Sequence, residues 1–192
     1  MVQDSGEVNV ITLWPTQLYV SKFNTDFELL ITEIYRLASV GPTDIKKSNY
    51  GGWQSDVHLY NNPVFKPICE HIARTCFGLF LKSNITVRQM WAGINRPGDQ
   101  NLVHSHGNIY NVSGIFYVKV PANSGEIVFR DPRPGSLNAP NHNKLFSKGG
   151  EYKFMPSQGT MLLVPSYLEH FVLPNRSDED RICVAFDITI ED

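Results

Sequence analysis

The chain has 192 residues, of which 42% are hydrophobic and 19% charged, and its formal net charge is −2. These values are typical of a soluble protein with one domain over residues 1–192, and they exclude the basic surplus that charge-driven nucleic-acid binding requires. We expect a cytoplasmic protein with reduced cysteines, since no secretory leader, no apolar run of membrane-spanning length and no CxxC pair is found.

Residues 1–84 are expected to form short strands and two helices. Asn9 to Lys22 predicts two short strands interrupted at Pro15. Thr25-Asp26-Phe27-Glu28 matches a capping box with the threonine as the cap, and apolar residues at helical spacing follow as far as Ala38. A second helix is predicted to begin at Asn62-Pro63, because proline suits the first helical turn.

From residue 85 to 190 the sequence consists of short runs rich in β-branched and aromatic residues. They are ITVRQMWAGIN, SGIFYVKV, GEIVFR, EYKFM, GTMLLV, HFVL and RICVAFDITI. Such runs predict the antiparallel strands of a sandwich or barrel. With the helices before them, they favour a mainly β (α+β) fold: a double-stranded β-helix, or jelly roll, with two N-terminal helices on one sheet.

One long segment, from Asp131 to Gly150, has no hydrophobic periodicity. Loops of this length are usually functional or mobile. The two interpretations that stay open are a lid over a site and a surface insertion.

Three elements of the β region carry chemically versatile side chains. His104-Ser105-His106 would place both imidazoles on one face of an extended strand, and imidazole is the commonest transition-metal ligand. His170 follows a proline corner at the rim of a sheet. Arg181 opens the last run, where alternation puts it on one face with Cys183, Ala185 and Asp187. Each has an ordinary alternative: hydrogen bonding for the histidines, and a surface ion pair with Asp178 or Glu179 for the arginine.

Taken together, the HxH pair, a later histidine and an arginine eleven residues after it resemble the 2-oxoglutarate- and Fe(II)-dependent oxygenase superfamily. The pattern of that superfamily is HxD/E, a distal histidine and then an arginine or lysine. More narrowly, the blocks SGIFYVKVP, SGEIVFRDPR and PSYLEHFVLPN resemble a group of such oxygenases found in bacterial and phage genomes. The resemblance covers roughly residues 86–189.

The resemblance implies that His104 and His170 bind Fe(II) and that Arg181 binds the C5 carboxylate of 2-oxoglutarate. His106 stands where the superfamily has a carboxylate, which leaves two ligand sets open. We slightly favour His104, His106 and His170 over a set in which Asp131 supplies the third ligand.

The implied activity is an Fe(II)-dependent oxygenation with 2-oxoglutarate and O2 as co-substrates and ascorbate as a supporting reductant. The substrate would be an amino-acid side chain on a protein or a free metabolite, with neither nucleic acid nor membrane as a partner. Tyr110 is a candidate contact for 2-oxoglutarate. Further candidate contacts for substrate or co-substrate are Trp91, Asn95, Asn111 and Tyr117.

Two other classes of protein remain alternatives. One is a metal-binding cupin without 2-oxoglutarate, since Gly98 and His104-x-His106 match the opening of the cupin signature, although its glutamate is missing. The other is a non-catalytic jelly-roll binding module, because this fold hosts many functions. The oligomeric state is open, with a homodimer as one alternative.

Overall fold

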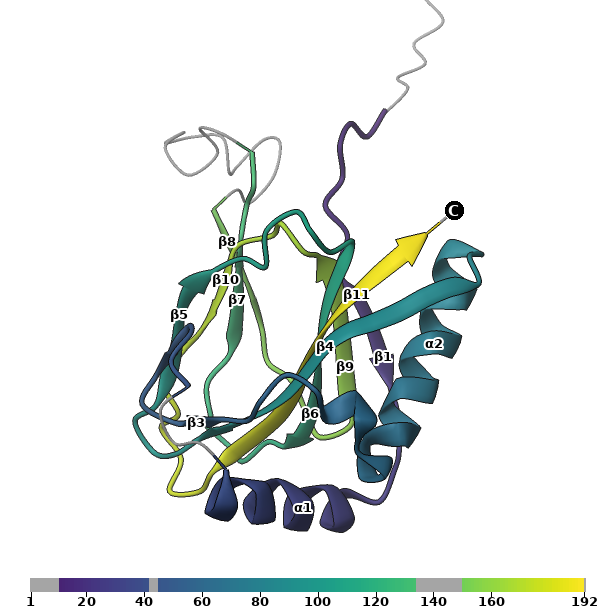
Figure 1. The fold of residues 1–192 in the computed structure, drawn as a ribbon. Helices are drawn as coiled ribbons and strands as arrows, with labels where there is room; N and C mark the ends of the chain where they lie inside the picture. The colour runs from purple at the N-terminus through teal and green to yellow at the C-terminus, as the bar shows by residue number, and fades with distance from the viewer. Residues whose placement is uncertain (1–10, 42–44, 134–149, 192) are drawn as a thin grey trace, which may run out of the picture.

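The computed structural model describes residues 11–41, 45–133 and 150–191. In these residues two antiparallel sheets face each other, and two helices lie against one of them (Figure 1). The first sheet has the strand order β1 (Tyr19–Lys22), β9 (Thr160–Pro165), β6 (Val112–Lys119), β11 (Arg181–Glu191), β4 (Asn84–Asn95) and β3 (Trp53–Gln54). The second has the order β2 (Asn49–Tyr50), β5 (Gln100–His104), β10 (His170–Val172), β7 (Ile127–Arg130) and β8 (Glu151–Phe154). This is the double-stranded β-helix that the sequence predicts.

Both predicted helices are present, with small differences at their first residues. Helix α1 (Phe27–Val40) is capped by Asp26, whose carboxylate accepts a hydrogen bond from the Leu29 amide at 3.0 Å. The predicted cap, Thr25, was therefore one residue too early. Helix α2 (Lys66–Phe80) follows two short 3-10 helices, η1 (Leu59–Asn61) and η2 (Pro63–Phe65), so the predicted proline start is a 3-10 turn.

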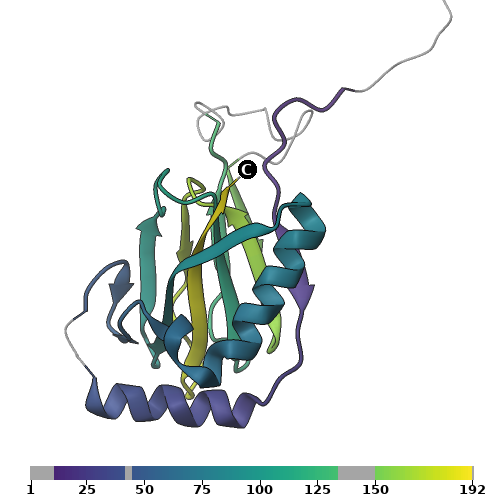
Figure 2. The ribbon, with the colours of Figure 1, turned by 45° about the vertical axis from the view of Figure 1, so that its right-hand side comes forward.

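Helix α2 lies in front of the outer face of the first sheet, and α1 runs along the lower end of the strands (Figure 2). Their buried side chains share one hydrophobic cluster with the face of β11 that alternation predicted to be apolar, with α1 in contact with β6 and α2 in contact with β4. The members are Leu30 and Ile34 of α1, Ile68, Ile72 and Cys76 of α2, and Ile182, Val184, Phe186 and Ile188 of β11. Burial of this much apolar surface is the main force that holds the helical layer on the sheet.

A second apolar cluster lies between the two sheets, and it leaves a cavity beside it. Its buried members are Tyr117, Ile127, Phe129, Leu162, Val164, Leu168 and Val172. The opposite face of β11, with Arg181, Cys183, Ala185 and Asp187, lines the cavity, as the alternation predicted. The two faces of β11 therefore have different surroundings, since one belongs to the core beneath the helices and the other lines the cavity between the sheets.

Some expectations do not match the structure. The first of the two strands predicted in Asn9 to Lys22 is not formed in its described part, because residues 11–18 have no strand partner and Trp14 is 83% exposed. Strands β2, β3 and β5 were not predicted. Residues 134–149 of the candidate lid lie outside the described residues. Neither α1 nor α2, the helices of the described part, is long and apolar enough to cross a membrane.

Candidate metal centre

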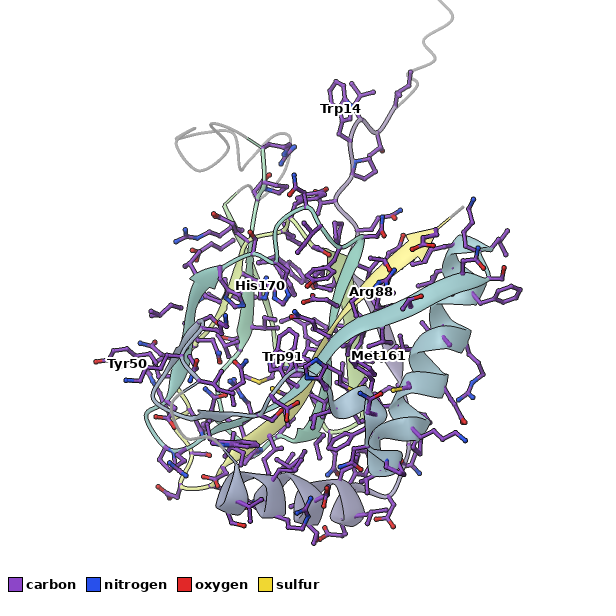
Figure 3. All side chains as sticks on the ribbon, in the orientation of Figure 1. Trp14, Tyr50, Arg88, Trp91, Met161 and His170 are labelled. Atoms are coloured by element: carbon purple, nitrogen blue, oxygen red, sulfur yellow. The ribbon has the colours of Figure 1, made fainter. Side chains whose placement is uncertain are left out.

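The three histidines singled out in the sequence meet between the sheets. His104 ends β5 and His170 begins β10, and antiparallel pairing sets them directly opposite each other. His106 lies two residues beyond β5, where its amide donates a hydrogen bond to the Ser166 carbonyl at 2.9 Å. One ring nitrogen of each histidine lies within 4.8 Å of the others. Figure 3 shows His170 among the side chains that fill the space between the sheets.

All three imidazoles donate from Nδ1 to an oxygen that can only accept a hydrogen bond. The acceptors are the Leu102 carbonyl for His104 (2.8 Å), the Leu168 carbonyl for His170 (2.9 Å) and the Asp187 carboxylate for His106 (2.6 Å). Because Nδ1 holds the proton, each neutral ring keeps the lone pair on Nε2. The site thus presents three lone pairs in one place, which suits a transition metal.

The pKa values of two of these histidines support the neutral form. Burial lowers the pKa of His170 to about 3, and the neighbouring His104 contributes to this shift. Burial also lowers the pKa of His104. Neutral imidazole is the form that binds metals, so these two rings need lose no proton to bind an ion at neutral pH.

Asp187 is a functional candidate that the sequence did not single out. It lies on the cavity face of β11, and its Oδ1 accepts a hydrogen bond from the Ser113 hydroxyl at 2.6 Å as well as from His106. Alternation had placed it on the face of Arg181. No spacing in the sequence indicated its contact with His106, which lies 81 residues away.

Asp131, the alternative third ligand, lies just beyond β7. Its carboxylate accepts a hydrogen bond from Arg133 Nε at 2.9 Å. In the described part of the chain, it does not belong to the group of side chains close enough to share an ion. The structure brings His104, His106 and His170 together, and Asp131 is paired with Arg133.

Arg181 lies at the start of β11 and is 2% exposed. Its Nη1 donates to the Ser124 carbonyl at 3.1 Å, whereas Glu179 pairs with Lys119 at 2.9 Å. Within the described residues, Arg181 Nε and the hydroxyl of Tyr117 have no hydrogen-bond partner. Burial raises the pKa of Tyr117, and the nearby Arg181 guanidinium opposes that shift. Buried donors without acceptors are costly, so Arg181 suits an anionic ligand in the cavity that it lines; Tyr117 is not among the described residues of that lining.

The cavity has a volume of about 320 Å3 and connects Arg181 with the three histidines. Trp91 stacks near His106, with ring centroids 5.7 Å apart and planes at 27°. Tyr110 and Asn95 also line the cavity. Asn111, a candidate contact from the sequence, instead accepts a hydrogen bond from the Ile190 amide at 2.7 Å and thereby supports the end of β11.

Comparisons with known proteins identify the family and the fold. A family described as "Putative 2OG-Fe(II) oxygenase" matches residues 89–187. No curated protein sequence matches the chain.

Among solved structures, the non-heme alpha ketoglutarate dependent epimerase SnoN from nogalamycin biosynthesis is 11% identical, with a TM-score of 0.69 over 91% of this chain and 76% of that one. A Pseudomonas putida prolyl-4-hydroxylase is 14% identical, with a TM-score of 0.64 over 91% and 93%. The viral collagen prolyl hydroxylase from Paramecium bursaria Chlorella virus-1 is 15% identical, with a TM-score of 0.62 over 89% and 94%. At these identities the similarity concerns the fold.

Proposed function

Because the chain belongs to the 2OG-Fe(II) oxygenase family, we propose that it is a non-haem dioxygenase that hydroxylates an amino-acid side chain or a small molecule. The observation that carries the proposal is one cavity that contains three converging imidazoles and a buried arginine. The family implies Fe(II) and 2-oxoglutarate, and it favours this interpretation over the cupin and the non-catalytic module.

The residues present fit an iron ion. His104, His106 and His170 would hold it through Nε2, since hydrogen bonds already fix Nδ1 in each ring. Three protein ligands leave open positions for small molecules. When bound, the iron supplies the redox chemistry by which 2-oxoglutarate and O2 oxidise the substrate, with succinate and carbon dioxide as by-products. Asp131, which pairs with Arg133, does not belong to this group among the described residues.

The residues at the other end of the cavity fit the distal carboxylate of 2-oxoglutarate. Arg181 stays charged at any physiological pH, and its planar fork matches a carboxylate. Arg181 Nε, which has no partner among the described residues, would gain an acceptor from such a ligand. The co-substrate would thereby be oriented between the arginine and the histidines without help from solvent.

The side chains around the metal site would orient the substrate and exclude water. Trp91 forms a wall next to His106, and Tyr110 lines the same cavity. Tyr110 is the residue that we propose as a contact for 2-oxoglutarate or the substrate on this side. Orientation of the reactants in a dry cavity is the protein's main contribution to such a reaction.

Succinate release without added substrate tests the proposal. The protein is loaded with Fe(II) and mixed with 2-oxoglutarate, ascorbate and O2, and slow succinate formation is expected. His170→Ala should abolish it, whereas His58→Ala should not, since His58 is 64% exposed at its side chain and lies outside the histidine group. An iron-loaded, folded protein that neither binds 2-oxoglutarate nor forms succinate would contradict the proposal.

A further inference from the structure

We propose that Asp187 is a positioning residue for the metal site, acting through His106. It would hold His106 in the tautomer that presents Nε2 to the ion. It would also supply a negative charge that reaches the ion through the hydrogen bond to His106, whereas the superfamily has a carboxylate that binds the iron directly. This inference rests on the proposed function, because it requires metal binding by the three histidines.

The contact between these two side chains differs from those of the other ligands. His104 and His170 donate to neutral backbone carbonyls, whereas His106 donates to a carboxylate at 2.6 Å. The side chains of His106 and Asp187 are only 10% and 3% exposed. A hydrogen bond to a buried carboxylate is short and strong, and it makes the imidazole a better electron donor to a metal.

The fold holds Asp187 in place from both sides. It lies on β11, the strand between β4 and β6, where Ser113 is its direct neighbour on β6. The Ser113 hydroxyl donates to the same carboxylate oxygen as His106, at 2.6 Å. The pairing of β11 with β4 becomes irregular directly after Asp187. Two donors on one oxygen fix the carboxylate before any metal arrives.

Few charged side chains line the cavity, and the carboxylate of Asp187 is one of them. Among the described residues that line it, the charged side chains are Arg181, Asp187 and Lys47. Burial of a carboxylate is costly unless its oxygens are paired, and the two donors to Asp187 Oδ1 are the side chains of His106 and Ser113. A divalent ion on His106 would compensate the charge of Asp187. The net charge at the ion would then equal that of a site with two histidines and one carboxylate ligand.

Two substitutions of Asp187 separate positioning from simple packing. Asp187→Asn keeps the shape but removes the charge, and Asp187→Ala removes both. The matched control is Asp178→Asn, because Asp178 is an exposed carboxylate that does not line the cavity. Binding of Mn(II) to the full chain is measured by calorimetry, and the absorption spectrum of the Co(II)-loaded protein reports the geometry of the ligands.

We expect Asp187→Ala to weaken Mn(II) binding about 10- to 100-fold and to alter the Co(II) spectrum, as is typical of lost hydrogen-bond partners of metal-binding histidines. Asp187→Asn should weaken Mn(II) binding at least tenfold at unchanged melting temperature of the metal-free protein, and the control Asp178→Asn should leave it unchanged. The inference is wrong if folded Asp187→Asn binds Mn(II) within threefold of the parent and keeps its Co(II) spectrum.

His170→Ala, measured in parallel, distinguishes this failure from failure of the proposed function. If His170→Ala loses Mn(II) binding while Asp187→Asn keeps it, the metal site is supported and the proposed role of Asp187 is wrong. If His170→Ala also binds Mn(II) like the parent, the metal site itself is wrong.

Discussion

Substitution of Arg181 tests the co-substrate end of the cavity. The side chain is 2% exposed, its Nη1 contacts the Ser124 carbonyl, and its Nε has no partner within the described residues. Arg181→Ala therefore removes a positive charge and its hydrogen-bond donors from a buried position in the lining of the cavity.

The size of the effect follows from this burial. Truncation of one partner of a buried, hydrogen-bonded charge pair costs about 2–5 kcal/mol. At 1.4 kcal/mol for each factor of ten, the affinity for 2-oxoglutarate should fall by about 30-fold to several thousand-fold. Arg181→Lys keeps the charge but loses the planar fork, so we expect a loss of about tenfold from one charge-assisted hydrogen bond.

The assay is calorimetric titration of 2-oxoglutarate into the Mn(II)-loaded protein without oxygen, which prevents turnover. Arg176→Ala is the matched control, because Arg176 is exposed and does not line the cavity. Mn(II) affinity should be unchanged in both variants. If Arg181→Ala binds Mn(II) normally and 2-oxoglutarate within threefold of the parent, Arg181 does not anchor the co-substrate.

Three further predictions concern the metal ligands, pH and packing. His106→Ala should abolish tight Mn(II) binding in a calorimetric titration and Asp131→Ala should leave it intact; the opposite result would favour the set with Asp131. Burial lowers the pKa of His71 below its ordinary 6.5. As the pH falls, His71 is therefore protonated in the unfolded chain before it is protonated in the folded one. The free energy of unfolding of the metal-free protein should fall as the pH drops below about 6.5. His71→Phe should make melting temperature less dependent on pH in that range, and an unchanged pH profile would refute this role. A Cβ on Gly114 would lie 2.3 Å from the Phe186 ring, so Gly114→Ala should lower the free energy of unfolding in urea by about 1–3 kcal/mol, and a loss below about 0.5 kcal/mol would contradict the packing.

Sequence patterns predicted the elements in which hydrophobic residues recur at the spacing of a helix or a strand and so form one apolar face. The alternation in β11 identified both its helix-facing and its cavity-facing side chains, because a strand with two distinct surroundings must alternate strictly. The start predicted at Asn62-Pro63 was close for a similar reason, since proline has few other acceptable positions in a helix; the structure has a 3-10 turn there, and α2 follows from Lys66.

The remaining features depend on contacts between distant segments. Strand β5 contains Gln100 and Asn101, and it forms because His104 pairs with His170 across the sheet. The contact of Asp187 with His106 joins β11 to the segment that follows β5, and local sequence patterns do not record such contacts. Only the resemblance predicted that the three histidines converge. The number of residues between His106 and His170 does not predict the distance between their side chains, because that distance depends on how the two sheets pack.

The positions of Arg181 and Asp187 on a single strand have a consequence for how chains of this kind can vary in length. The two residues are six positions apart on β11, which corresponds to roughly 20 Å of extended backbone. Gain or loss of one residue between them would turn one of the two toward the helices, and gain or loss of two would change their separation by about 7 Å. We therefore expect insertions and deletions among relatives to fall in the connecting loops and to spare this interval.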